Sequence, residues 1–280
     1  MINKYNIAKK ILKTFNNLVG FKNSLIIFKK FLPILQPKYA FPVAWLCLDE
    51  FPLNKTTEQE YTYGSLRKFP QTKVKVNPKC LHSRFFALSG YYEEELTAEI
   101  LSPKRKGLLI DIGANFGYYP VLWLQKKDTR VIAVEPVVEY VNLLHENLKN
   151  YESRYAVFDG CIGDRDGVAF LDTVGDPTML SRVVTDADRK EARQVPMLTL
   201  NSLLTKYNEE KIDILKIDAE GYDIAILESC KPLFKAKAIK TVFWETANSI
   251  EEKDIVTFLE NLGYVKILNK AITGYELPSL

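Results

Sequence analysis

LLIDIGANFGYY, residues 108–119, decides the fold of this chain. An apolar run interrupted only by Asp111 reaches a turn with glycines at positions 113 and 117, and a further apolar segment follows. A buried strand that enters a glycine-bearing turn and then a helix is typical of a doubly wound α/β sheet. Ligands of such sheets bind at the carboxyl ends of the strands, so we expect a ligand at this turn.

The pattern after Gly107 repeats this unit. Apolar runs that we interpret as strands alternate with segments of helical periodicity, and the predicted strands are RVIAVEP (130–136), RYAVFDGCIG (154–163), DILKID (213–218) and AIKTVFWET (238–246). The stretch 164–194 is interpreted as a turn-rich insertion, and GYVKIL and AITGYEL (263–277) as a closing antiparallel hairpin. Residues 91–280 are therefore predicted to form one domain with a doubly wound, mostly parallel sheet.

Residues 1–90 are predicted to be a basic, partly helical N-terminal extension. Eight lysines and no acidic residue precede Asp49, so residues 1–48 carry a net charge of +8. The net charge of the whole chain is +3, which leaves −5 for residues 49–280. Apolar residues at helical spacing among the lysines of residues 1–33 indicate an amphipathic helix, which either contacts an anionic inner membrane surface or packs on its own domain. Further along, TKVKVNP (72–78) predicts a strand and SGYYEEELTAEIL (89–101) a helix begun by Ser89.

The cysteines and the apolar runs indicate where the protein works. The four cysteines are far apart and form no Cys-x-x-Cys pair, which disfavours a disulfide framework and a structural zinc site. The N-terminal apolar runs are too short for a secretory signal, and no run reaches transmembrane length. A cytoplasmic location fits these features best, with peripheral contact to the inner membrane surface through residues 1–33 as the alternative to packing of this segment on its own domain.

The residues of the glycine turn distinguish between the ligands that it could bind. A dinucleotide-binding turn that begins at Gly113 requires glycines where this chain has Asn115 and Tyr118. No Gly-Lys-Ser/Thr sequence follows, so the turn is not a phosphate-binding P-loop. The carboxylate of Asp111 would repel a pyrophosphate but stabilise a cationic ligand. This favours S-adenosylmethionine, which has an ammonium group, a positive sulfur and no phosphate.

Acidic residues follow the next two predicted strands. Glu135 lies 24 positions after Asp111, about the offset at which an acid reaches a ribose in a strand-helix-strand unit. Asp164 lies in the turn after the third strand, where an adenine edge is expected, and Cys161 could pack on the adenine face. Each acid has a structural alternative: Asp111 as a helix cap, Glu135 as an exposed strand-end acid, and Asp164 in an Asx turn.

The sequence from about Tyr91 to Thr246 resembles the FkbM-type S-adenosylmethionine-dependent methyltransferases. The resemblance is carried by DIGANFGYY, VIAVEP, IGDRDG, VPMLTLNSLL and LLTKYNEEKIDILKIDAEGYDIAILES. It implies a class I methyltransferase fold and O-methylation of a sugar, a glycan or a small hydroxylated metabolite. It further implies site residues: a donor loop of Asp111, Gly113, Asn115 and Gly117, with Glu135 at the ribose, Asp164 near the adenine, and Asp218 and Glu220 facing the methyl group.

Two positions depart from the family pattern. Asn201 stands where the family often has an aspartate, and Glu245 is present in WETAN without the histidine that commonly lies near it. Glu245 therefore stays a candidate catalytic residue, and no role is transferred to a histidine.

The carboxylates of the KIDAEG block suit methyl transfer to a hydroxyl. Alignment of donor and acceptor supplies much of the acceleration, and a carboxylate can remove the hydroxyl proton. Asp218 or Glu220 could be this base, or the pair could hold a divalent ion that orients a sugar diol. The structural alternative is that Asp218 caps the helix beginning near Tyr222, with Lys216 pairing one of the two acids.

We therefore expect an S-adenosylmethionine-dependent O-methyltransferase that acts on a small-molecule or glycan acceptor. Nucleic acid is not expected as a partner, because residues 49–280 carry −5 and lack a base-flipping NPPY-like loop. Two alternatives stay open. One is N- or C-methylation of another small metabolite, and the other is a module that binds S-adenosylmethionine without catalysis.

Overall fold

The computed structural model of the protein describes residues 62–77, 80–151, 153–172, 182–184 and 193–278. The chain divides into two compact units, residues 1–97 and 98–280. The predicted amphipathic helix of residues 1–33 lies outside the described residues, and the assignment of separate roles to residues 1–90 and 91–280 stays a prediction. Within the described ranges, no helix is long and apolar enough to span a membrane.

The first unit contains an antiparallel hairpin and a helix. Strand β1 (Thr62–Leu66) pairs with β2 (Phe69–Val76), which confirms the predicted strand, and α4 (Leu81–Ser89) packs on β1. The predicted start of the next helix at Ser89 is wrong. Ser89 ends α4, where its hydroxyl donates to the carbonyls of Phe85 (2.8 Å) and Tyr91 (2.9 Å), and Gly90 adopts a left-handed φ of 74°. Helix α5 (Glu94–Leu101) begins only after this turn.

The second unit is built on a seven-stranded sheet with the order β12-β13-β11-β10-β3-β4-β5. Strands β11, β10, β3, β4 and β5 are parallel, whereas β13 is antiparallel to both β11 and β12. This confirms the predicted doubly wound, mostly parallel sheet with a terminal hairpin. The strands are β3 (Gly107–Ile112), β4 (Thr129–Glu135), β5 (Tyr155–Asp159), β10 (Ile212–Ile217), β11 (Ile239–Glu245), β12 (Val265–Asn269) and β13 (Ile272–Glu276).

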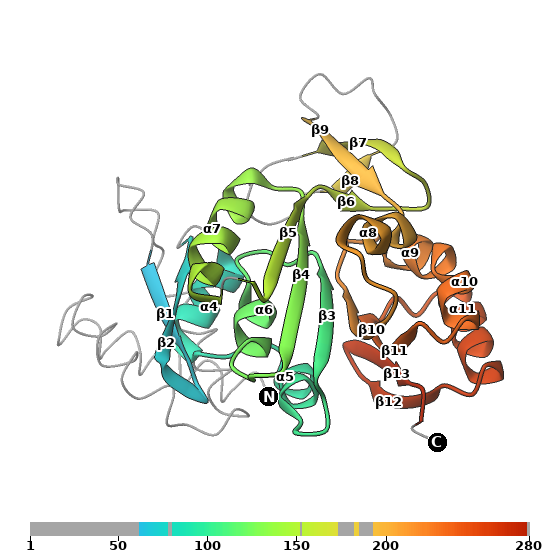
Figure 1. Ribbon diagram of the computed structural model, residues 1–280, viewed down its shortest axis with the longest axis horizontal. Helices are drawn as coiled ribbons and strands as arrows, with labels where there is room; N and C mark the ends of the chain where they lie inside the picture. The colour runs from blue at the N-terminus through green and yellow to red at the C-terminus, as the bar shows by residue number, and fades with distance from the viewer. Residues whose placement is uncertain (1–61, 78–79, 152, 173–181, 185–192, 279–280) are drawn as a thin grey trace, which may run out of the picture. The chain divides into compact units, whose positions relative to one another are not determined.

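Helices cover both faces of this sheet, which is why its central strands are apolar on both sides. Helices α6 (Tyr118–Trp123) and α7 (Val138–Leu148) lie on one face, and α7 leads into the short η3 (Lys149–Tyr151). The opposite face carries α8 (Leu200–Tyr207), α9 (Asp223–Ser229), α10 (Lys231–Lys235) and α11 (Ile250–Asn261) (Figure 1).

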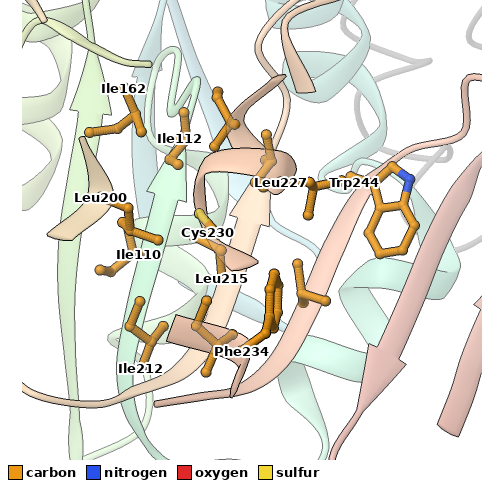
Figure 2. Close-up of a cluster of buried hydrophobic side chains, with 14 of the residues drawn as sticks. Ile110, Ile112, Ile162, Leu200, Ile212, Leu215, Leu227, Cys230, Phe234 and Trp244 are labelled. Atoms are coloured by element: carbon orange, nitrogen blue, oxygen red, sulfur yellow. The ribbon is translucent and has the colours of Figure 1, made fainter. Parts of the chain in front are cut away.

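The core on the second face decides which way the β3 side chains point. Ile110 and Ile112 join a buried cluster that includes Leu200, Phe234 and Trp244 (Figure 2). Since side chains alternate along a strand, Asp111 must point to the opposite face, where α6 lies. The apolar pattern of the strand therefore fixes the position of its single acid.

The turn-rich insertion predicted for residues 164–194 is wrong for the part that the structure describes. Strands β6 (Cys161–Ile162), β7 (Gly167–Asp172), β8 (Arg182–Val184) and β9 (Arg193–Leu198) form a second sheet with the order β6-β9-β7-β8. Its small core contains Ala169 and Leu171 of β7 with Val195 and Met197 of β9, while Val168 is exposed. These short strands bury one face only, so their apolar signal is weak in the sequence.

Candidate functional site

The glycine loop, residues 113–117, joins the carboxyl end of β3 to α6. The N–H groups of Gly113 and Ala114 donate to the carbonyl of Val134 at 3.0 and 3.1 Å, which ties the loop to β4. A Cβ atom on Gly113 would lie 1.9 Å from the carbonyl oxygen of Asp218, so the loop also lies against the end of β10. Three strand ends therefore meet at this loop.

Asn115 shapes the loop from within. Its φ of 50° is left-handed, a conformation that asparagine tolerates better than most residues. Its side-chain oxygen accepts the N–H of Phe116 at 2.8 Å, and its own N–H donates to Glu135 at 2.8 Å. Asn115, which argues against a dinucleotide-binding turn, thus closes this loop through two hydrogen bonds. The predicted contact of Asn115 with the methyl donor stays a prediction.

Glu135 is buried at the end of β4, with 5% exposure, so the alternative of an exposed strand-end acid is wrong. Its carboxylate accepts two backbone N–H groups, from Asn115 at 2.8 Å and from Val137 at 2.9 Å. Burial raises the pKa of Glu135 to about 7, the two N–H bonds oppose this shift, and the charge of Asp111 adds to it. Each carboxylate oxygen keeps a lone pair that could accept a hydrogen bond from a ligand hydroxyl.

A buried lysine joins the acids of β3 and β10. Lys216 Nζ lies 3.2 Å from Asp111 Oδ1 and 3.2 Å from Asp218 Oδ2, and it lies 5.4 Å from the ring centroid of Tyr119. Asp111 is 0% exposed and Lys216 is 3% exposed. The predicted pairing of Lys216 with Asp218 or Glu220 is confirmed for Asp218, and the second partner, Asp111, was not predicted. A single lysine inside the buried run DILKID was the signal that could have identified this buried cation.

Neither aspartate caps a helix. The N-cap of α6 is Gly117 and that of α9 is Tyr222, and neither helix start has a side-chain cap hydrogen bond. The capping alternatives for Asp111 and Asp218 are therefore wrong, and the ion pairs with Lys216 account for both acids.

Three further carboxylates lie at the same edge as Asp218. Glu245 follows the aligned pair Ile217 and Trp244 of β10 and β11, so it lies beside Asp218. Glu220 is half-buried in the loop after β10 and has a left-handed φ of 50°. Asp223, which is not among the predicted site residues, is 5% exposed at the start of α9. We call Asp218, Glu220, Asp223 and Glu245 the acidic edge.

The acids of this edge affect one another electrostatically. Partial burial raises the pKa of Glu245, although its side chain stays exposed at one end of β11, and the charges of Asp218 and Asp223 raise it further, while Lys216 lowers it. The pKa of Asp223 is also raised, first by burial and then by Asp218. An edge of this composition attracts a cationic ligand and holds carboxylates that can accept a proton.

The residues after β5 lie close to the same strand ends. Cys161 is buried, and burial together with the charge of Glu135 raises the pKa of its thiol to about 12. Asp164 is exposed, and its Oδ2 atom lies 3.8 Å from Nη1 of the Arg165 guanidinium. The Asp164 side chain also forms a hydrogen bond with the Tyr222 hydroxyl. The contact with Tyr222 connects the predicted adenine region to the loop after β10.

No three His, Cys, Asp or Glu side chains in the described part of the chain are grouped so that they could hold a metal ion. The hypothesis of a divalent ion between the acids therefore gains no support from their arrangement.

A family model described as the methyltransferase FkbM domain matches residues 111–266, more than half of the chain. No curated protein matches the sequence. Among solved structures, the chain is similar to TrmK of M. capricolum in complex with S-adenosyl-homocysteine, with 11% identity, 65% of this chain and 67% of that chain covered, and a TM-score of 0.37. It is also similar to a precorrin-6y C5,15-methyltransferase from Geobacter metallireducens, with 12% identity, 65% and 85% covered and a TM-score of 0.37. A third similar structure is an rRNA methylase from Streptococcus thermophilus, with 10% identity, 65% and 92% covered and a TM-score of 0.37.

Proposed function

The chain belongs to the FkbM methyltransferase family, and from this premise we propose that it methylates a hydroxyl group of a sugar, a glycan or a small hydroxylated metabolite. The family implies S-adenosylmethionine as the methyl donor. The observation that carries the proposal is the position of two carboxyl residues at adjacent strand ends: Asp218 directly follows β10 and lies against Gly113 of the glycine loop, and Glu245 ends β11 one residue after the partner of Ile217. Carboxylates in these positions support the proposal because they can accept a proton near the loop that we assign to the donor.

The residues at the strand ends fit this donor chemically. S-adenosylmethionine, when bound, supplies an electrophilic methyl group on a positively charged sulfur. The carboxylates of the acidic edge outnumber their cation Lys216, and this excess of negative charge favours a sulfonium. Glu135 offers two oxygens to the ribose hydroxyls. Asp111 is not a bare charge, because Lys216 pairs with it, so we assign it to positioning Lys216 and the loop.

The acceptor hydroxyl must lose its proton as its bond to the methyl group forms. A carboxylate beside the reacting oxygen can accept this proton, a role that typically contributes about 10²- to 10⁴-fold to the rate. Asp218, Glu220 and Glu245 are the predicted candidates for this proton acceptor.

The proposal predicts which ligands the protein binds and which acceptors it modifies. Calorimetry should detect binding of S-adenosylmethionine and no binding of NAD.

A turnover assay with a panel of sugars, glycans, amines and RNA tests the acceptor class. S-adenosylhomocysteine should be released with sugars, glycans or hydroxylated small molecules only, and product analysis should locate the methyl group on oxygen. Release with amines or RNA instead would replace the proposed acceptor class. Binding without release on the whole panel would favour the non-catalytic module.

Replacing a carboxylate of the acidic edge tests the catalytic assignment. We expect Glu245→Gln to lower kcat by about 100-fold or more while the dissociation constant of S-adenosylmethionine changes by less than about threefold. Glu228→Gln is the matched control, because Glu228 lies on α9 in an exposed pair with Lys231. Wild-type turnover in Glu245→Gln would remove this residue from the mechanism.

The raised pKa of Glu135 predicts that ribose binding depends on pH. The ionised carboxylate accepts ribose hydroxyls better than the protonated form, so affinity should rise as pH increases through the pKa of about 7. At pH 6 only about a tenth of Glu135 is ionised, so the dissociation constant of adenosine should be about tenfold higher than at pH 8. 2′,3′-Dideoxyadenosine, which lacks both hydroxyls, should bind equally at the two pH values. Equal affinity for adenosine at pH 6 and pH 8 would show that Glu135 does not bind the ribose hydroxyls.

We also propose a cytoplasmic location with peripheral contact to an anionic membrane through residues 1–33. The support is the sequence alone, with eight lysines and no acid before Asp49. In a liposome flotation assay the protein should float with anionic vesicles and not with neutral ones. No flotation with either would leave packing on the protein itself as the role of this segment.

A further inference from the structure

Asp223 is a buried carboxyl group of which the fold uses only one oxygen. The residue is 5% exposed, and Oδ2 accepts the N–H of Ala219 at 3.3 Å. Oδ1 is buried and has no hydrogen-bond partner among the described residues. An unsatisfied buried acceptor lowers stability, so packing alone does not account for a carboxyl group at this position.

The strand register makes Asp218 and Glu245 neighbours, and a loop hydrogen bond ties Asp223 to the residue after Asp218. Ile217 of β10 is aligned with Trp244 of β11, so Asp218 and Glu245 are the next residues on strands about 4.8 Å apart. Asp223 is tied to the same loop through Ala219, the residue after Asp218. Like charges at this spacing resist ionisation together.

Lys216 distinguishes between these carboxylates. It lies 3.2 Å from Asp218 and also binds Asp111, so the charge of Asp218 is partly compensated by a buried cation. One oxygen of Asp218 is therefore engaged in an ion pair with a buried lysine. Glu245 is exposed at the end of β11, where an acceptor can reach it. The charged groups that act on Glu245 are Asp218, Asp223 and Lys216, and the two acids both favour its protonation.

We propose that Glu245 removes the proton from the acceptor hydroxyl, and that Asp223 is a positioning residue whose buried charge makes Glu245 a better proton acceptor. The inference rests on the proposed O-methyl transfer. As the oxygen-carbon bond forms and the carbon-sulfur bond breaks, the hydroxyl proton passes to the Glu245 carboxylate. S-adenosylhomocysteine then leaves with a neutral sulfur.

The coupling between the two acids can be measured without any substrate. The carboxyl carbon of Glu245 is followed by NMR through a pH titration, with its signal identified by its loss in Glu245→Gln. In Asp223→Asn the midpoint should fall by at least about 0.3 pH unit, because a negative neighbour has been removed. Asp223→Ser keeps an oxygen that can accept the Ala219 N–H and should give the same fall. Glu228→Gln removes a charge from the exposed part of α9 and should leave the midpoint unchanged.

A purely structural role of Asp223 predicts a different result. Both Asp223 variants would then unfold at lower temperature while the Glu245 midpoint stayed at its wild-type value, and that outcome overturns the inference. An equal shift in Glu228→Gln would also overturn it. In turnover measurements the acid limb of kcat/KM should move to lower pH in Asp223→Asn. The two proposals can fail separately. If the Glu245 midpoint falls in Asp223→Asn but the wild-type protein transfers no methyl group, the proposed function is contradicted and the coupling between the two acids stands.

Discussion

Gly113→Ala is expected to abolish donor binding and to lower the free energy of unfolding by about 3 to 5 kcal/mol. Gly113 has a φ of 74°, which an L side chain rarely adopts, and the added Cβ atom would lie 1.9 Å from the carbonyl oxygen of Asp218. That oxygen belongs to the backbone and cannot rotate away, so the glycine loop itself must move. A displacement of about 1 Å at a binding loop can cost about 100-fold in function.

Gly263→Ala is the matched control for this substitution. Gly263 has a φ of 87°, and nothing lies within 4 Å of the position of its added Cβ atom. The same alanine should therefore cost only the backbone strain, about 1 to 2 kcal/mol, with no change in the affinity for S-adenosylmethionine. Denaturant unfolding and calorimetry measure both quantities. If the two variants lost the same stability and both bound the donor normally, the close approach of Gly113 to β10 would have no functional role.

Lys216→Met is expected to lower the free energy of unfolding by about 3 to 5 kcal/mol at pH 8. The variant leaves Asp111, which is 0% exposed, without its cation 3.2 Å away. A buried carboxylate without a counter-ion takes up a proton more readily than it does in the unfolded chain. Stability then falls as pH rises above the unfolded pKa, so the deficit should be smaller at pH 5 than at pH 8. Urea unfolding at the two pH values measures this difference.

Two variants show whether charge or packing causes the loss. Asp111→Asn combined with Lys216→Met removes both charges of the buried pair and should regain part of the lost stability. Lys211→Met changes an exposed lysine that precedes β10 and should stay within about 0.5 kcal/mol of wild type. A deficit that is independent of pH and is not reduced in the double variant would assign Lys216 to packing against Tyr119.

The order of the strands and helices after Gly107 was predictable because it depends on local periodicity. Central parallel strands are buried on both faces, so their sequences are continuous apolar runs. The closing hairpin is predictable from two short strand-like segments joined by Asn269 and Lys270. The sequence predicts the wrong role for Ser89, because a serine followed by acids resembles a helix start. In the structure its hydroxyl contacts Phe85 and Tyr91 at a helix end. The sheet of β6 to β9 was missed because its strands are short and half exposed.

The sequence by itself determined the sheet, the glycine loop and the positions of Asp111, Glu135, Asp218 and Glu245 at strand ends, because these features follow from spacing along one chain. The tertiary structure alone decided how those acids are arranged. The register of β3, β10 and β11 brings Lys216 between Asp111 and Asp218 and aligns Asp218 with Glu245. The close fit of Gly113 to β10 and the burial of Asp223 likewise depend on neighbours distant in sequence. Burial and charge pairing are properties of those contacts, and local periodicity carries no information about them.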